Sequence, residues 1–324
     1  MNLARLARTS LCMTLFGTAG RLVAQASPVF VAEPVAIPRA PGELAGTLLA
    51  PRTSTQVPVV LFIAGSGPTD RDGNGPGFTP GSLRQLAESL AVQQIATLRF
   101  DKRGVGGSAS AMIPEVQLTF EMLADDAAAW VRVLAKDRRF SQVIVAGHSE
   151  GALLGLLASQ QVPVAGYVSI AGPARPADEG LHDQLAKQLP APLLEQSDSI
   201  LARLKRGVTI DSTPPILASL FRRSVQPYLI SWFKYSGRAE LARLRAPCLI
   251  VQGTHDLQVA PTEIELLKQA NIRCQVARIE GMNHVLKLTP ADMAGQLASY
   301  RAPDAQLAPG LVDAVIAFVR TLGK

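Results

Sequence analysis

The stretch Gly147-His148-Ser149-Glu150-Gly151 constrains the fold more than any other part of the chain. It follows a short β-branched run, 141–146, that is typical of a buried strand, and it precedes an apolar run, 152–158, that predicts a buried helix. A G-x-S-x-G sequence between a strand and a helix forms a sharp turn, where glycines without Cβ atoms let the two elements pass closely. The pattern predicts that the Ser149 hydroxyl is held above the carboxyl end of a sheet as a nucleophile. The alternative is a glycine-rich turn whose serine only caps the helix.

Strand and helix signals alternate along most of the chain. Such alternation with short loops predicts an α/β protein with a mostly parallel sheet and helices on both faces. The expected strands lie at 29–35, 43–49, 57–64, 95–100, 141–146, 164–171, 247–252 and 274–279, and the expected helices at 82–92, 119–134, 152–158 and 312–322.

The alternation is interrupted between the sixth and seventh expected strands. Residues 173–245 have helical apolar spacing and no clear strand, and several prolines would divide them into short helices. We interpret this block as an inserted helical cap. The expected units are therefore a core formed by 27–172 and 246–324 and a cap formed by 173–245.

The first 26 residues have the features of a secretory signal. Arg5 and Arg8 give a positively charged start, an apolar stretch runs over 11–16, and Ala24-Gln25-Ala26 matches an A-x-A cleavage site. We expect residues 1–26 to be removed and the mature protein to be periplasmic or secreted. The alternative is an amphipathic N-terminal helix of a cytoplasmic protein.

Composition excludes several classes of protein. Of 324 residues, 48% are hydrophobic, which is enough for a sizeable core. The formal charge is +6, but residues 1–26 hold three arginines and no acid, so the remainder carries a scattered +3. This balance argues against a nucleic-acid partner. No apolar run is long enough to span a membrane.

The cysteines and histidines do not suggest a metal site. Cys12 would leave with the signal, and Cys248 and Cys274 both fall at predicted core strands. We expect these two to be buried free thiols, although neighbouring strands and an oxidising compartment would also allow a disulfide. The histidines are isolated and the cysteines lack ligand spacing, so we expect no metal.

A serine hydroxyl needs a base to accept its proton. His284 follows the last expected strand, which places it at the same edge of the sheet as Ser149. Asp256 follows the preceding strand and would orient the imidazole and stabilise its charged form. The order Ser149, Asp256, His284 predicts a catalytic triad. Alone, Asp256 could be a helix-cap or loop aspartate and His284 a loop histidine.

Two backbone N–H groups are expected to form an oxyanion hole. They belong to Glu150, at the helix start, and Ser66, between two glycines after the strand at 57–64. The charged stretch 70–72 follows and would either contact substrate or staple its loop with ion pairs. Asp101 and Arg103 are expected to close a turn with side-chain hydrogen bonds.

The cap supplies candidate pocket residues. Phe221, Tyr228 and Trp232 are spaced so that some would wall an acyl pocket, whereas most apolar cap residues would only attach the cap to the core. The other histidines are expected to lie outside the chemistry, with His148 packed inside the fold and His182 on the cap surface.

An ordered set of motifs resembles the bacterial serine carboxylesterases of the α/β-hydrolase superfamily. The motifs are G-S-G-P-T-D-R-D-G at 65–73, D-K-R-G at 101–104, G-H-S-E-G at 147–151, G-T-H-D at 253–256 and G-M-N-H at 281–284, together with the cap stretch 224–235. The resemblance implies an α/β-hydrolase fold with an eight-stranded, mostly parallel sheet whose second strand is antiparallel. It also implies hydrolysis of simple carboxylic esters without a cofactor. One departure is Ala64-Gly65, where many relatives carry His-Gly.

We therefore expect a serine hydrolase that cleaves short- to medium-chain esters through an acyl-enzyme. Its partner would be a small-molecule ester, with no cofactor, and the oligomeric state is not predicted. Within enzymes, the alternative is a peptidase or acyltransferase with the same triad. From another class, the alternative is a catalytically silent binding protein on the hydrolase fold.

Overall fold

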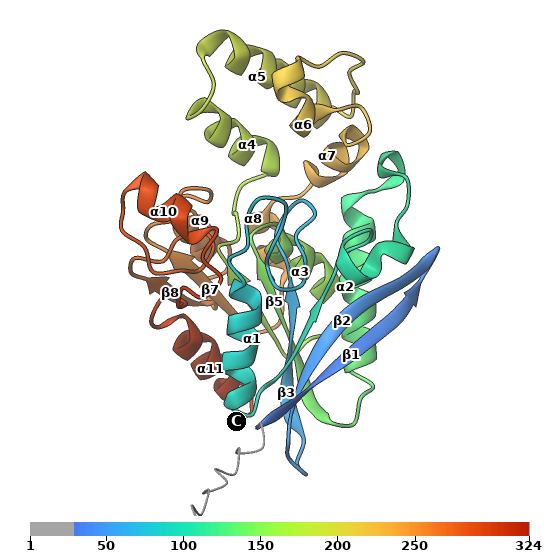
Figure 1. Cartoon of the computed structure of the whole chain (residues 1–324), viewed down its shortest axis with the longest axis vertical. Helices are drawn as coiled ribbons and strands as arrows, with labels where there is room; N and C mark the ends of the chain where they lie inside the picture. Colours follow the sequence, from blue (N-terminus) through green and yellow to red (C-terminus); the bar gives the residue numbers. More distant parts are fainter. Residues whose placement is uncertain (1–28, 324) are drawn as a thin grey trace, which may run out of the picture.

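An eight-stranded sheet runs through the centre of the molecule (Figure 1). The structure is a computed structural model that describes residues 29–323, so the predicted signal at 1–26 lies outside the described residues. The strand order is β1-β2-β4-β3-β5-β6-β7-β8, with β2 antiparallel to both neighbours and the strands from β4 to β8 parallel. This confirms the expected sheet. The strands are β1 (Phe30–Arg39), β2 (Gly42–Pro51), β3 (Val57–Ile63), β4 (Ala96–Phe100), β5 (Phe140–His148), β6 (Gly166–Ile170), β7 (Cys248–Gly253) and β8 (Gln275–Ile279).

Helices cover both faces of the sheet because alternate strand residues point to opposite sides. On β3, Val59 and Leu61 face one apolar layer, whereas Val60 and Phe62 face the other. The first layer is completed by α2 (Phe120–Leu134), α3 (Glu150–Gln161) and α9 (Glu263–Ala270), and the second by α1 (Ser82–Val92) and α11 (Leu311–Thr321).

The helix boundaries follow from local chemistry. Helix α2 begins after Thr119, whose side chain accepts a hydrogen bond from the N–H of Met122 and so caps the helix. Two short 3₁₀ segments, Gly106–Ala111 and Glu115–Gln117, fill the connection from β4 to α2. The sequence analysis did not predict two helices of the core. They are α9 (Glu263–Ala270), between β7 and β8, and α10 (Met293–Ser299), between β8 and α11.

Within the described chain, the inserted block between β6 and β7 contains short helices joined by loops, and no strand. Figure 1 shows α4 to α7 above the carboxyl ends of the strands, whereas α8 packs back against α3 and α9 of the core. The raised part has its own apolar centre, which includes Leu204, Leu217, Phe221 and Leu229. The elements are α4 (Ala177–Ala186), α5 (Ala191–Lys205), a 3₁₀ turn (Pro215–Leu217), α6 (Ala218–Phe221), α7 (Gln226–Trp232) and α8 (Gly237–Arg243).

The expectation of two free thiols is wrong. Cys248 and Cys274 form a disulfide, with their Cα atoms 4.6 Å apart. The parallel register of β7 and β8 pairs Leu249 with Gln275, so the two preceding cysteines face each other at the amino ends of these strands. The sequence showed that both were buried but did not fix the register that brings them together.

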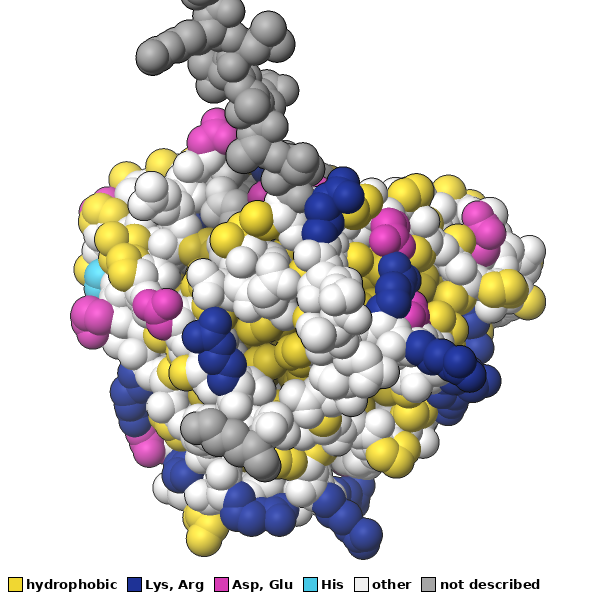
Figure 2. Space-filling model, turned by 90° about the horizontal axis from the view of Figure 1, so that it is seen from below, with side chains coloured by type: hydrophobic (Ala, Val, Ile, Leu, Met, Phe, Trp, Pro, Cys, Tyr) yellow, Lys and Arg dark blue, Asp and Glu magenta, His cyan; other side chains and the backbone are white. Residues whose placement is uncertain are grey.

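Charged side chains are distributed over the end of the molecule away from the cap. Figure 2 shows basic and acidic groups scattered there among apolar and neutral ones. Among residues 29–323, no helix is both long enough and apolar enough to cross a bilayer.

Candidate active site

Ser149 occupies a strained turn between β5 and α3. Its φ of 55° and ψ of −123° are rare for a residue with a side chain, and its N–H donates to the Ile170 carbonyl at 2.9 Å. A Cβ on Gly147 would lie 2.1 Å from the Gly151 carbonyl oxygen, and one on Gly151 would lie 2.2 Å from that of Ile63. Both glycines are therefore needed for the close passage of the helix over the strand ends.

Other strained residues gather at the same edge of the sheet. Ala171, directly after β6, has a φ of 50°, and Leu286, two residues after His284, has a φ of 65°. With Ser149, they account for three of the four non-glycine residues with positive φ in the described chain; the fourth is Gln94. Each such residue costs on the order of 1–3 kcal/mol, and such strain is typical of functional sites.

Buried hydrogen bonds join the side chains of Asp256 and His284. The Nδ1 of His284 lies 2.9 Å from Oδ2 and 3.1 Å from Oδ1 of Asp256. Oδ1 also accepts from the N–H groups of Gln258 and Val259, at 2.8 and 2.9 Å, and Oδ2 accepts from the amide of Gln252 at 3.2 Å. The carboxylate is held by its own loop, and it fixes Nδ1 of His284 as the donor.

The surroundings of Asp256 favour its charged form. Burial works against ionisation, but the nearby charge of His284, its hydrogen bond and the two backbone N–H groups outweigh it and hold the pKa of Asp256 below its usual value. Asp256 is 4% exposed and His284 5%, so little solvent weakens the pair. The arrangement supplies a permanent negative charge behind the imidazole.

His148 links the turn of Ser149 to the loop of His284. Its Nε2 donates to the backbone carbonyl of His284 at 2.8 Å, and the two rings lie 4.9 Å apart. Burial, followed by the proximity of His284, lowers the pKa of His148 to about 4. Within residues 29–323, no hydrogen bond joins the side chains of Ser149 and His284. The contact between His148, the neighbour of Ser149, and the His284 loop connects the serine turn to the Asp256–His284 pair.

The two predicted oxyanion donors lie at the same pocket as Ser149. Ser66 and Glu150 both line the cavity, and within residues 29–323 neither backbone N–H donates to a protein acceptor. The side chain of Glu150 is buried, with its Oε1 3.5 Å from the Nζ of Lys102. Lys102 Nζ also donates to the carbonyl of Gly65.

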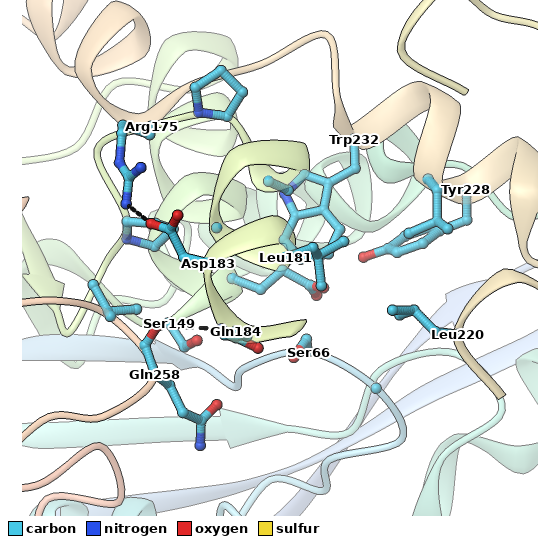
Figure 3. Close-up of a pocket in the computed structure, with 18 of the residues that line it drawn as sticks. Ser66, Ser149, Arg175, Leu181, Asp183, Gln184, Leu220, Tyr228, Trp232 and Gln258 are labelled. Atoms are coloured by element: carbon cyan, nitrogen blue, oxygen red, sulfur yellow. Dashed lines mark hydrogen bonds and ion pairs between the residues drawn. The ribbon is translucent and has the colours of Figure 1, made fainter. Parts of the chain in front are cut away.

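The pocket lies between the strand ends and the cap, with a volume of about 400 Å³. Figure 3 shows Leu181, Tyr228 and Trp232 of the cap across the cavity from Ser66 and Ser149 of the core. Ligand sites of this size are mainly apolar with a few polar groups, which matches this lining.

Tyr228 and Trp232 both belong to α7, which rests on α2. The Trp232 ring stacks on Phe120 with centroids 5.6 Å apart and planes 7° apart. The Tyr228 hydroxyl lies near Glu150, and burial, followed by that carboxylate, raises the pKa of Tyr228 well above its usual value.

The placement of Phe221 in the pocket wall is wrong. Its side chain is fully buried in the apolar centre of the cap, and its neighbours Leu220 and Arg222 line the cavity instead. Helical spacing gave the two faces of this segment but not the rotation that decides which face meets the pocket.

The charged residues at 70–72 hold their loop in place through ion pairs to the end of β4 and hydrogen bonds within the loop. Arg71 pairs with Asp101 at 2.6 Å, and Asp72 pairs with Arg99. Asp70 accepts hydrogen bonds from the N–H groups of Asp72 and Asn74, both at 2.8 Å. The sequence left two alternatives for these residues, substrate contact or ion pairs that hold the loop, and the structure contains the ion pairs.

The remaining histidines make local contacts. His182 pairs with Asp198 at 2.6 Å on the exposed side of the cap. His255 Nδ1 lies 2.7 Å from the Thr289 carbonyl. Within the described part of the chain, no three His, Cys, Asp or Glu side chains come together as a metal cluster.

A model of the alpha/beta hydrolase family matches residues 60–298. The chain belongs to this family. It is 28% identical over 269 residues to Esterase EstD of Thermotoga maritima, a match that covers 77% of this chain and 60% of the relative. The chain thus spans about three fifths of the length of that relative.

Solved structures show the same family fold. Est1E from Butyrivibrio proteoclasticus, solved with ferulic acid, has a TM-score of 0.56 and 16% identity, and the match covers 89% of this chain and 97% of that one. Proline iminopeptidase from Mycobacterium smegmatis has a TM-score of 0.52 and 20% identity, with 78% and 92% covered. At these identities the likeness concerns the fold alone, and the fold serves more than one reaction.

Sequence reasoning missed the part of the candidate site that lies behind the pocket wall. Lys102 lies within the D-K-R-G motif, for which the sequence predicted roles only at its neighbours Asp101 and Arg103. Its contact with Gly65 depends on the side-by-side pairing of β3 and β4, whose ends carry these two residues. A lysine directly after a buried strand was the one available signal.

Proposed function

We propose that the protein is a serine carboxylesterase that cleaves short- to medium-chain esters through an acyl-enzyme. Ser149 attacks the ester carbonyl, and the Nε2 of His284 takes the serine proton and then passes it to the leaving alcohol. Asp256 orients His284 and stabilises its charged form. Water, activated by the same histidine, releases the acid.

The proposal rests above all on the buried Asp256–His284 pair at the strand edge that also carries the strained Ser149. Since Nδ1 of His284 is committed to the carboxylate, Nε2 is the atom left to act as a base. The N–H groups of Ser66 and Glu150 would bind the oxyanion, because both border the pocket and neither has a partner within the described chain. The similarity to Esterase EstD supports an ester as the substrate.

The pocket supports small substrates. A cavity of about 400 Å³, with Tyr228 and Trp232 of the cap in its wall, limits the length of acyl chain that it can hold. Each added methylene favours binding only until the chain reaches the cap wall. Activity on p-nitrophenyl esters should peak at short to medium chains, without activation at a lipid–water interface.

The test is to replace the nucleophile and the base separately. Ser149→Ala and His284→Ala should each lower kcat by on the order of 10⁴- to 10⁶-fold with folding retained. A fluorophosphonate should label the native protein at Ser149 and leave Ser149→Ala unlabelled. Native activity that persists in Ser149→Ala would overturn the proposal. A protein that folds normally but is neither labelled nor active on any ester would instead be a silent binding protein.

The alternative reactions use the same machinery, so substrate panels separate them. Esters, thioesters and peptide amides should be compared at equal enzyme concentration, with and without an added alcohol as acyl acceptor. Highest activity on peptide amides would indicate a peptidase, and product formed mainly with the acceptor would indicate an acyltransferase.

We further propose that the protein is exported to the periplasm or secreted. The charged and apolar start of the chain with its A-x-A site supports this, and so does the Cys248–Cys274 disulfide, because such bonds persist in oxidising compartments. The mature protein from its native host should begin at Ser27. An intact N-terminus at Met1 or Asn2 on that protein would contradict export.

A further inference from the structure

We propose that Lys102 is a positioning residue of the oxyanion hole, which aims and polarises the peptide between Gly65 and Ser66. The inference rests on the proposed function, because it assigns a role within the same site. It follows from where Lys102 lies: behind the pocket wall, among buried groups, with its ammonium group on a backbone carbonyl.

The geometry of one peptide unit carries the argument. The carbonyl of Gly65 and the N–H of Ser66 are the two ends of a single planar, trans peptide, so they point in opposite directions. Lys102 Nζ holds the carbonyl end. Ser66 lines the pocket, whereas Lys102 does not appear among the lining residues of the described chain. Fixing the carbonyl on the buried side therefore turns the N–H toward the pocket.

The charge of Lys102 strengthens this donor as well as aiming it. A cation on a carbonyl oxygen draws electron density along the amide, which makes the N–H at the other end more positive. Such a preformed dipole acts where negative charge develops in the transition state, in a site with little water. Flanking glycines make this loop pliable, so a side-chain anchor compensates for the flexibility of its backbone.

The carboxylate of Glu150 lies beside the buried ammonium group of Lys102. Its Oε1 lies 3.5 Å from Nζ, and the side chains of Lys102 and Glu150 are only 6% and 1% exposed. An isolated ammonium group would be costly at this depth, and the neighbouring carboxylate reduces that cost. Because Glu150 also supplies the second oxyanion N–H, this one ion pair connects the two donors of the hole.

The experiment compares Lys102→Met with the native enzyme on one short-chain ester. Loss of a single oxyanion donor costs on the order of 10²- to 10³-fold in kcat. Loss of its positioning should lower kcat by roughly 10- to 100-fold, with KM changed by less than about threefold. The inhibition constant of a trifluoromethyl ketone, which forms a tetrahedral oxyanion on Ser149, should rise in step. Binding of an ether of the same shape, which has no carbonyl oxygen, should stay unchanged.

Arg103→Met is the matched control. Arg103 follows Lys102 in the same turn, its side chain is 5% exposed, and it pairs with buried Asp126 at 2.7 Å. This variant removes an equally buried cation without touching the pocket, so it should lower the melting temperature and leave kcat of the folded protein within a few-fold of native. If Lys102→Met fails to fold, the pair Lys102→Met and Glu150→Gln removes both charges together and is measured instead.

The outcomes separate this inference from the proposed function. A folded Lys102 variant with native kcat, while Ser149→Ala is inactive, overturns the role of Lys102 alone. An equal loss of ether binding and of kcat also overturns it, because a general distortion of the pocket would do the same. Activity that survives in Ser149→Ala overturns the proposed function.

Discussion

The strand edge and the cap meet at one pocket but are built in different ways. At the strand edge, position is set by backbone: the Ser149 turn is fixed by the packing of Gly147 and Gly151, and Asp256 is held by N–H groups of its own loop. In the cap, position is set by side chains on short helices, with Trp232 stacked on Phe120 and Tyr228 beside Glu150.

This difference suggests a division of roles: the strand edge would carry out the proposed reaction, and the cap would determine which substrates fit. Backbone-held groups tolerate little movement and supply the same reaction whatever the substrate. Side-chain walls can be exchanged one at a time without disturbing the sheet. We therefore expect changes at the strand edge to act mainly on kcat, and changes in the cap to act on substrate range, KM or local stability.

Apart from the replacements of Ser149 and His284 proposed above, the largest effect is expected for Asp256→Asn. An amide in place of the carboxylate cannot hold the same tautomer or stabilise the imidazolium, so kcat should fall by on the order of 10³- to 10⁴-fold. Asp101→Asn is the control, because Asp101 only staples Arg71 and Gly107. It should lower the melting temperature and keep kcat within roughly tenfold. If the order of these two losses in kcat were reversed, the assignment of the acid would fail.

In the cap, Phe221→Ala and Trp232→Ala are expected to have different effects, the first on stability and the second on the preferred substrate. Removal of the fully buried Phe221 should destabilise the cap by about 3–5 kcal/mol, with the preferred acyl length unchanged. Trp232→Ala opens the pocket wall and should move the preferred p-nitrophenyl ester to a longer chain. Denaturant unfolding and a chain-length series measure the two effects. A shift in chain length caused by Phe221→Ala would place that residue in the wall after all.

Low pH should reduce the free energy of unfolding through the titration of His148. The pKa of this histidine falls from 6.5 to about 4 on folding, so between these values the unfolded chain binds a proton that the native protein does not. Stability is fully present above pH 6.5 and is lost as the pH falls toward 4, by about 2–3 kcal/mol. Asp256, with its lowered pKa, loses its contribution only at lower pH still.

His148→Gln tests this assignment. Glutamine keeps an N–H donor for the His284 carbonyl but does not titrate. Chemical denaturation between pH 4 and 7 should therefore show a flatter dependence for the variant. An unchanged slope would mean that another group carries the proton uptake.

The smallest effect is expected where the two regions join. Glu263 of α9 accepts from the N–H groups of Ala174 and Arg175, at 2.8 and 3.1 Å, and from Nε of Arg175 at 2.5 Å. Glu263→Gln should cost about 1.5–3 kcal/mol, because hydrogen bonds to a charged group are lost. Since the cap then sits less firmly, KM should rise several-fold while kcat changes little. A fall in kcat alone would argue against a role of Glu263 in holding the cap in place.

Much of the strand edge could be predicted because its signals are local. The glycines around Ser149, the apolar runs before Asp256 and His284, and their order along the chain do not depend on distant contacts. The role of Lys102 could not be predicted, because it depends on the backbone carbonyl of Gly65 in the loop after β3. Every residue has such a carbonyl, so the sequence does not show which one a lysine will contact.

The cap helices and the two cysteines show which features local sequence signals could not predict. Phe221 and Tyr228 both fit an amphipathic pattern, yet only packing between α5, α6 and α7 decides which one meets the pocket. Cys248 and Cys274 are 26 residues apart, and their pairing depends on the register of β7 against β8. Rotation and register are tertiary quantities that a single sequence does not fix.

The disulfide joins β7 and β8, and the loops after these two strands carry the proposed acid, Asp256, and the proposed base, His284. Strand β8 is the last in the sheet, so it has a strand neighbour on one side only. A covalent pin at the amino ends of β7 and β8 prevents these strands from sliding past each other, and any slide would separate Asp256 from His284. The disulfide at the amino ends of these strands thus helps to keep His284 aligned with Asp256 at their carboxyl ends. Reduction of this disulfide is therefore expected to disturb the proposed Asp256–His284 pair as well as the stability of the fold.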